Sequence, residues 1–153
     1  WRVHDRVRRS ALIVRSSARR LAGRPDLALV DATAAAEVDR PDHWSLLERA
    51  RVHEALGDVR SMRADAEAAL THNPGHSAAY AVRGQARALA NDLPGALEDL
   101  RAAVARRPDE PTHREELGRL LLAMGKPEEG QRELDEARRL APWRFREGPS
   151  STG

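Results

Sequence analysis

The sequence has 153 residues, of which 41% are hydrophobic but only 3% aromatic, so any core must consist mainly of Ala, Leu and Val. The absence of cysteine excludes disulfide scaffolds, thiolate metal sites and cysteine nucleophiles. No apolar run approaches the roughly 20 residues that span a bilayer, so these residues contain no transmembrane helix.

Basic residues concentrate at the N-terminal end. Residues 1–24 hold eight arginines against one acid, a net charge of +7, whereas the rest of the chain carries −5. Apolar residues in the same segment recur at spacings of mostly three or four, which predicts one amphipathic helix from about residue 2 to 22. These residues are Val3, Val7, Val14, Ala18 and Leu21.

The first residue is Trp1 rather than Met, so we expect the chain to be part of a longer protein whose remainder lies N-terminal. A targeting signal in that remainder would lie outside these residues. For the part present here, the expectation is a cytoplasmic location.

A 34-residue period runs along the chain in units 9–42, 43–76, 77–110 and 111–144. Position 27 of every unit is alanine: Ala35, Ala69, Ala103 and Ala137. Position 32 is proline in the last three units, and the first unit has Pro41 one residue late. A period of this length is typical of solenoids built from repeated helix pairs.

Small residues also recur where two helices of a pair would cross. Positions 8 and 20 hold Ser16, Ala50, Gly84 and Gly118, and Ala28, Met62, Ala96 and Gly130. Two antiparallel helices approach closely only where their side chains are small, so we expect these positions to lie at the crossing points.

Glycine and proline mark the predicted helix ends. Gly23-Arg24-Pro25, Gly57-Asp58 and Gly125-Lys126-Pro127 each place a helix-ending glycine before a first-turn residue, and Asp92 is expected to cap the helix that opens near Pro94. Eight helices are predicted, at about 10–22, 26–38, 43–56, 59–71, 77–90, 93–106, 111–124 and 127–140.

The residues at these recurring positions resemble those of the tetratricopeptide repeat family. Its 34-residue helix-turn-helix unit carries the pattern W-x2-L-G-x2-Y, then A-x3-F, A and P. The last unit matches best, with Leu117-Gly118, Leu121, Gly130, Leu134, Ala137 and Pro142 on those columns. The third unit supplies Tyr80 and Gly84 but has Arg83 and Arg87 where Leu and Tyr are expected.

The resemblance implies an all-α fold, a right-handed superhelical solenoid of antiparallel helix pairs with about four units. We expect an N-terminal extension over 1–8, a degenerate helix pair over 9–42, and three repeats over 43–76, 77–110 and 111–144. The tail 145–153 is expected to be disordered, and Trp143 and Phe145 to fold back onto the last helix.

In the resembled family, positions 2, 5, 9 and 12 of each unit face a concave groove that binds partners. Those positions imply a protein or peptide site made of Trp44, Leu47, Arg51, Glu54, Ala81, Gln85, Ala88, Glu115, Arg119 and Leu122. Arginines there could hold a carboxylate bidentately. The alternative is that Arg51 and Arg119 only form surface ion pairs with Glu54 and Glu115.

Some family members grip a free C-terminal carboxylate with Lys, Asn and Arg at fixed positions. The corresponding residues here are Leu47, Arg51, Val82, Thr112 and Glu116, so that clamp is absent. An internal helical or extended peptide is the more fitting ligand.

Catalytic and metal-binding patterns are missing from the sequence, so we expect no enzyme activity, no cofactor and no metal. His72 and His76 have the spacing of a helical metal pair, but Pro74 and Gly75 between them prevent a helical turn. The acid pairs Glu115-Glu116 and Glu128-Glu129 are interpreted as solvated helix faces.

Two alternatives concern the N-terminal helix. Its arginines could contact nucleic acid or an anionic membrane surface, although aromatic stacking partners are nearly absent. Its apolar stripe could instead mediate self-association.

Overall fold

The computed structural model describes residues 2–145, and the expectations for Trp1 and for the tail after residue 145 lie outside this range. Within the described residues the chain forms eight α-helices and no strand, as predicted, and a short 3-10 helix that was not predicted. The helices are α1 (Arg2–Leu21), α2 (Pro25–Glu37), α3 (His43–Leu56), α4 (Val59–His72), α5 (Ser77–Leu89), α6 (Leu93–Arg106), α7 (Pro111–Ala123) and α8 (Pro127–Leu140), followed by η1 (Pro142–Phe145).

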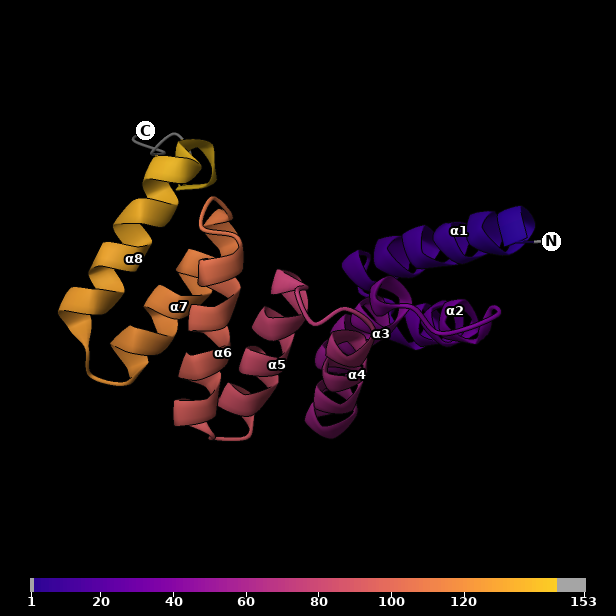
Figure 1. The fold of residues 1–153 in the computed structure, drawn as a ribbon, viewed down its shortest axis with the longest axis horizontal. Coiled ribbons are helices and arrows are strands. Elements are labelled where there is room, and N and C mark those ends of the chain that lie inside the picture. The colour runs from indigo at the N-terminus through magenta and orange to yellow at the C-terminus, as the bar shows by residue number, and fades with distance from the viewer. Residues whose placement is uncertain (1, 146–153) are drawn as a thin grey trace, which may run out of the picture.

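The helices form four antiparallel pairs that stand side by side along the molecule, from α1–α2 at one end to α7–α8 at the other (Figure 1). Each helix packs on its neighbours in the sequence, and the first helices of successive pairs also contact one another, α1 with α3, α3 with α5 and α5 with α7. Because each pair contacts only the pairs beside it, the structure is a helical solenoid.

One residue ends the first helix of every pair in the left-handed conformation. Gly23, Gly57 and Gly125 have φ of 75°, 75° and 74°, and Asn91 takes the same place in the third pair with φ of 63°. Glycine and asparagine are the residues that tolerate this conformation at a helix end. Asp92 follows and accepts a hydrogen bond from the amide of Gly95 at 3.0 Å, which confirms its predicted capping role.

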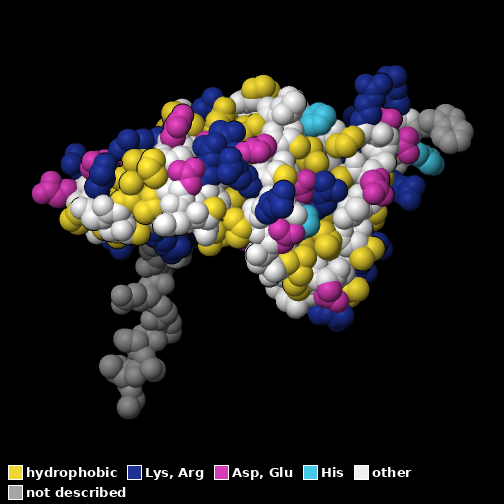
Figure 2. All heavy atoms as spheres, turned by 90° about the horizontal axis from the view of Figure 1, so that it is seen from below, with side chains coloured by type: hydrophobic (Ala, Val, Ile, Leu, Met, Phe, Trp, Pro, Cys, Tyr) yellow, Lys and Arg dark blue, Asp and Glu magenta, His cyan; other side chains and the backbone are white. Residues whose placement is uncertain are grey.

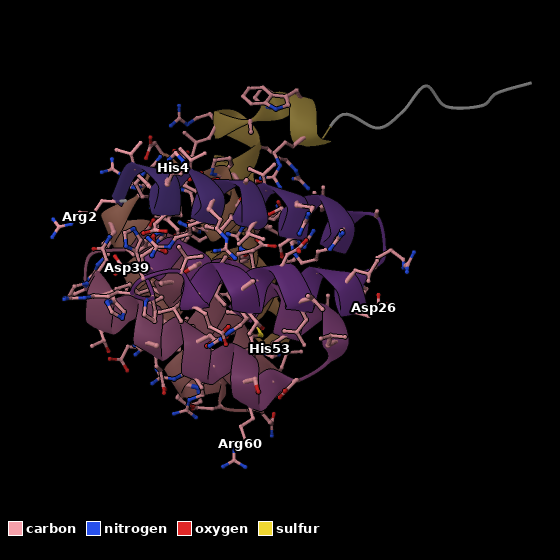
Figure 3. The ribbon with its side chains drawn as sticks, turned by 90° about the vertical axis from the view of Figure 1, so that its right-hand side faces the viewer. Arg2, His4, Asp26, Asp39, His53 and Arg60 are labelled. Atoms are coloured by element: carbon pink, nitrogen blue, oxygen red, sulfur yellow. The ribbon has the colours of Figure 1, made fainter. Side chains whose placement is uncertain are left out.

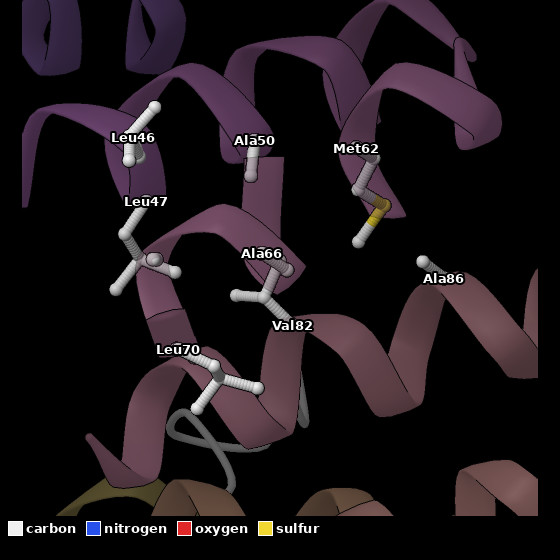
Figure 4. Packing of buried hydrophobic residues seen from close by; sticks show 10 residues of the cluster. Leu46, Leu47, Ala50, Met62, Ala66, Leu70, Val82 and Ala86 are labelled. Atoms are coloured by element: carbon white, nitrogen blue, oxygen red, sulfur yellow. The ribbon is translucent and has the colours of Figure 1, made fainter. Parts of the chain in front are cut away.

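The predicted small residues lie at the helix contacts. The four alanines at position 27 are each 0% exposed. Where α3, α4 and α5 meet, Ala50, Ala66 and Ala86 pack among larger side chains such as Met62 and Leu70 (Figure 4). Buried alanines keep the helices close, and a few leucines, valines and one methionine fill the remaining space.

Two glycines lie at the crossing of α7 and α8. A Cβ atom added to Gly118 would lie 2.8 Å from Cγ of Leu134 and 2.9 Å from the carbonyl oxygen of Gly130. A Cβ atom on Gly130 would in turn lie 2.8 Å from the carbonyl oxygen of Gly118. The backbones of the two helices therefore touch at a pair of facing glycines.

The first three pairs contain an ion pair between an arginine and a buried aspartate, and it repeats with the 34-residue period. An arginine at position 7 donates two hydrogen bonds of 2.7–2.9 Å to an aspartate sixteen residues later. The pairs are Arg15–Asp31, Arg49–Asp65 and Arg83–Asp99, and the three aspartates are at most 6% exposed. Arginine thus occupies the column where the family pattern has leucine.

Position 11 adds a second basic residue to each of these aspartates. Arg19 and Arg87 approach Asp31 and Asp99 to 2.8 and 3.0 Å, and His53 lies 3.6 Å from Asp65. The hydrogen bonds from Arg15 lower the pKa of Asp31 below its usual value. The α1–α2 pair therefore has the same polar interior as the two pairs that follow it.

The chain after α8 turns back toward the start of α7. Arg144 donates a hydrogen bond to Oγ1 of Thr112 at 2.8 Å. Trp143 is 68% exposed, so the prediction that it packs onto the last helix is wrong. The segment is attached through the arginine rather than the aromatic ring. The side chain of Phe145 lies outside the described part of the chain.

Candidate binding cleft

An open cleft of about 470 Å³ runs along the first helices of the last three pairs. α3, α5 and α7 form its walls, together with the chain that leads into α5 and α7. Its lining residues are Arg20, Trp44, Arg51, Glu54, His76, Ser77, Ala78, Ala81, Val82, Gln85, Arg107, Glu110, Thr112, His113 and Glu116. Basic, acidic and apolar side chains are likewise interspersed over the face of the molecule in Figure 2.

Five of the ten predicted groove residues line this cleft, namely Trp44, Arg51, Glu54, Ala81 and Gln85. Leu47 does not. It is 3% exposed and packs in the core with Met62, Ala66 and Val82, because α4 and α5 cover that face of α3 (Figure 4). Leu47 therefore cannot contact a partner, which corrects the prediction for this residue.

The other four predicted residues lie away from the cleft lining. Ala88 packs against the core around α6 and α7. Arg119 forms an ion pair with Glu115 on its own helix, which is the surface pairing considered as the alternative. Leu122 borders a separate shallow depression on the side of α8. The family positions therefore do not identify the residues of the fourth unit that line the cleft.

His76 lies in the cleft with a free N–H group. It caps α5, and its Nδ1 accepts a hydrogen bond from the amide of Ala79 at 3.3 Å. Because the accepting nitrogen carries no proton, Nε2 of the neutral ring is the protonated nitrogen. Nε2 is buried and has no hydrogen-bond partner among the described residues. Burial, and then the nearby charges of His43 and Arg51, lower the pKa of His76, which keeps the ring neutral.

His113 on α7 repeats this situation. The residue is 6% exposed, its Nε2 lies 3.3 Å from Oγ of Ser77, and its Nδ1 has no partner in the described part of the chain. Burial is the largest cause of its lowered pKa. Two neutral imidazoles with unmatched nitrogens therefore line one end of the cleft.

Glu116 is the acid with the strongest perturbation in the cleft. Its Oε1 accepts a hydrogen bond from Nε2 of Gln85 at 2.6 Å, whereas its Oε2 is buried without a partner among the residues described. Burial, followed by the negative charge of Glu54, raises its pKa to about 7. The interpretation of Glu115-Glu116 as a solvated acid pair is therefore wrong for Glu116.

The charges of the cleft are unevenly paired. Arg20 and Arg107 form ion pairs with Glu48 and Asp109, both at 3.3 Å. Within residues 2–145, Arg51 and Glu54 form no ion pair, although they lie one turn apart on α3. The Arg51–Glu54 surface pair considered as the alternative is therefore absent, and the cleft keeps an unpaired guanidinium and an unpaired carboxylate.

Trp44 gives the cleft an apolar wall. It is 57% exposed, and its ring lies edge-on to His76 with 4.7 Å between the ring centroids. His43 lies against both rings, at 5.1 Å from Trp44 and 5.0 Å from His76. An exposed indole held in place by two imidazoles is a rigid surface on which a ligand side chain can pack.

The predicted groove lacks three lining residues, His76, His113 and Glu116, because the family positions used to predict it do not include theirs. They occupy positions 34, 3 and 6 of their units, outside that set. A signal was nevertheless present, because His76 directly follows Gly75 at the start of a predicted helix, a place typical of capping residues. Their meeting in one cleft depends on how successive helix pairs stack.

The structure gives no support to a metal at the histidine pair. His72 is exposed whereas His76 is buried. In residues 2–145 no three histidine, aspartate or glutamate side chains are placed to hold a metal ion. The helices of this range also include none that is both long and apolar enough to cross a membrane.

Part of the basic N-terminal segment is used by the fold. Five of its eight arginines bond to other parts of the chain: Arg15 and Arg19 to Asp31, Arg20 to Glu48, Arg24 to Asp26, and Arg9 to Asp42 and to the carbonyl oxygens of residues 38 and 40. Arg2 extends outward at the end of the α1–α2 pair, near Asp39 (Figure 3). The apolar stripe of α1 is exposed, with Val3, Val7, Val14 and Leu21 at 64–78%.

No family model matches the sequence, and no curated protein does so either. Solved structures do match. TTC0263, a thermophilic TPR protein of Thermus thermophilus, is 19% identical with a TM-score of 0.82, over 88% of this chain and 75% of that one. The first TPR of Spaghetti (RPAP3), solved with an HSP90 peptide, is 21% identical with a TM-score of 0.70, over 77% and 94%.

A third structure is YrrB, described as a TPR protein with an unusual peptide-binding site. It is 16% identical with a TM-score of 0.68, over 88% of this chain and 69% of that one. At these identities the likeness concerns the fold, and it agrees with the 34-residue period and the four helix pairs. The chain has the fold of the tetratricopeptide repeat proteins.

Proposed function

We propose that this chain is a non-catalytic interaction module that binds a segment of a partner protein in the cleft between α3, α5 and α7. The cleft is open, contains an exposed tryptophan, and holds several polar groups without partners. A site of this kind, with an apolar wall and a few placed polar groups, suits a peptide rather than a compact substrate.

The observation that carries the proposal is the set of unmatched buried atoms in one cleft, on His76, His113 and Glu116. Buried polar groups in folded proteins are nearly always hydrogen-bonded, so a cluster without protein partners needs water or a ligand. Two of the structures with this fold are described as peptide-bound or as having a peptide-binding site, which supports the same function here.

The test is a random peptide library displayed on phage and selected on the purified chain. Peptides that bind in the cleft should change their affinity by roughly tenfold or more in an Arg51→Glu variant, because a charge in the cleft is reversed. Arg119→Glu is the matched control, since Arg119 is 72% exposed and lies outside the cleft lining. Circular dichroism verifies that both variants remain helical.

Affinity that changes equally in both variants would mean that only overall charge matters. Affinity that is unchanged by Arg51→Glu would place the site on another face, and the proposal would fail. The selection with the Arg119→Glu control therefore separates the cleft from the remaining surface.

A further inference from the structure

The unpaired charge in the cleft is mainly negative. Glu54 and Glu116 line it without an ion pair to any described residue. One carboxylate oxygen of Glu110 accepts a hydrogen bond from the amide of Thr112 at 3.1 Å. Among the lining arginines, two are already paired with acids, and Arg51 alone has no such partner within residues 2–145. Three carboxyl groups therefore face one uncommitted guanidinium.

Glu116 is placed to bind a donor that the chain does not provide. Its Oε1 is held by Gln85, which fixes the direction of the carboxyl group, while Oε2 stays buried without a partner. The charge of Glu54 acts on Glu116 more strongly than that of Arg51, although both lie on α3. A cation entering between the two acids would relieve their repulsion and satisfy Oε2.

A second observation points independently to a ligand at this place. His76 is 9% exposed, lines the same cleft, and carries an N–H group at Nε2 with no acceptor among the described residues. A backbone carbonyl of a bound peptide would supply that acceptor. The exposed ring of Trp44, which packs on His76, would lie along the methylene stem of a long basic side chain.

We infer that the partner segment presents a lysine or arginine side chain, whose cationic head binds between Glu116 and Glu54 while a carbonyl of the same segment accepts from His76. The inference rests on the proposed peptide-binding function and names the chemistry of its ligand. An acidic side chain in this position would face Glu54, Glu110 and Glu116 with Arg51 as its only unpaired counter-ion among the described residues.

The test uses three capped tripeptides as probes: acetyl-Leu-Lys-Leu-amide, and the same peptide with norleucine or glutamate at the centre. Norleucine keeps the methylene stem and removes the charge. Affinities are measured by NMR titration of amide shifts in the cleft. We expect the lysine peptide to bind about tenfold more tightly than the norleucine peptide, because one hydrogen bond to a buried charged group increases affinity by about that factor.

The preference for lysine should disappear in Glu116→Gln, because the introduced amide oxygen can still accept from Gln85 but carries no charge. The matched control is Glu98→Gln, a change of an exposed acid on α6 outside the cleft, which should keep the full preference. Equal binding of the lysine and norleucine peptides, tighter binding of the glutamate peptide, or no binding of any probe would each overturn the inference.

The proposed function and this inference fail in different ways. If the affinity of library peptides responds to Arg51→Glu but the peptides contain no enriched lysine or arginine, the cleft binds peptides and only the ligand chemistry is wrong. If no library peptide depends on the cleft, the function itself is wrong.

Affinity for the lysine peptide should rise between pH 6 and 8, since the bound cation needs the ionised form of Glu116. The charges near Glu116 are Glu54 and Arg51 from α3, and Glu115 and Arg119 from α7. His76 and His113 also line the cleft, and both are present in Glu116→Gln. A rise in affinity with pH that persists in that variant would therefore come from the histidines and would count against the inference.

Discussion

The aspartates inside the helix pairs and Glu116 in the cleft are acids with opposite surroundings. Inside the first three helix pairs, Asp31, Asp65 and Asp99 each accept two hydrogen bonds from an arginine. In the cleft, Glu116 receives one bond from a neutral amide. The pKa of Asp31 is lowered by Arg15, whereas burial raises that of Glu116 to about 7. A buried acid with its own cation holds the fold together, and one without a cation is available to a ligand.

The fourth helix pair shows that the ion pair is not required by the fold. Leu117 replaces the arginine, and the two helices approach through Gly118 and Gly130. Glu133 stands where the other pairs have aspartate, and it bonds to Arg114 at 2.8 Å in a more exposed position. Four substitutions test this difference between the helix pairs and the cleft.

The largest effect is expected for Asp99→Ala. The change leaves Arg83 and Arg87, whose side chains are 21% and 18% exposed, without their carboxylate. Removing one partner of a buried ion pair costs about 3 to 5 kcal/mol, and we expect the lower end because both arginines reach water in part. Urea unfolding measures the loss, with the exposed Glu98→Ala on the same helix as the control. A loss below about 1 kcal/mol would mean that the ion pair is not structural.

Glu116→Gln should stabilise the chain at high pH. Because the folded state raises the pKa of Glu116 from 4.5 to about 7, the folded wild type holds this proton more tightly than the unfolded chain. Its stability therefore falls as pH rises from about 4.5 to about 7 and stays low above that, by about 3 kcal/mol in total.

Urea unfolding of both proteins at pH 5 and pH 8 checks this. The variant should be clearly more stable than wild type at pH 8 and differ little at pH 5. Histidines titrate in both proteins, so their contribution cancels in the difference. If the stability of the two proteins depended equally on pH, ionising Glu116 would cost the fold no stability. Glu116 would then behave like an acid that has its own cation.

Gly118→Ala tests the packing that replaces the ion pair in the last helix pair. The new Cβ would meet the backbone of Gly130, which cannot move aside as a side chain can. We expect a loss of about 1 to 2 kcal/mol, since overpacking outweighs the helix propensity gained with alanine. At Gly84 the nearest atoms are side-chain atoms at 3.1 Å, so Gly84→Ala should cost less. If thermal unfolding showed a larger loss of stability for Gly84→Ala than for Gly118→Ala, the contact between Gly118 and Gly130 would not be the tighter one.

The smallest effect is expected for Glu133→Ala. Its ion pair with Arg114 is more exposed than that of Asp99, at 26% for the glutamate side chain against 2%. A partly exposed pair is worth about 1 kcal/mol or less. The same urea measurement compares it with Asp99→Ala, and equal losses would remove the distinction between the fourth pair and the others.

Much of the fold could be predicted because its determinants are local and periodic. Ala35, Ala69, Ala103 and Ala137 recur every 34 residues, and each must fit a helix crossing wherever the pairs stack. The Arg–Asp pairs recur with the same period and could also have been found, as Arg15, Arg49 and Arg83 each precede an aspartate by sixteen residues. They were missed because arginine was read as a departure from the family pattern.

Spacing along the chain is enough to predict the eight helices, their pairing and the small residues at their crossings. Which side chains share the cleft depends instead on how the helix pairs pack. His76 belongs to the end of one unit, Gln85 to the next and Glu116 to the last, and their burial depends on three helices from different pairs. Leu47 is removed from the cleft for the same reason, since its exposure is decided by the helices that pack against α3.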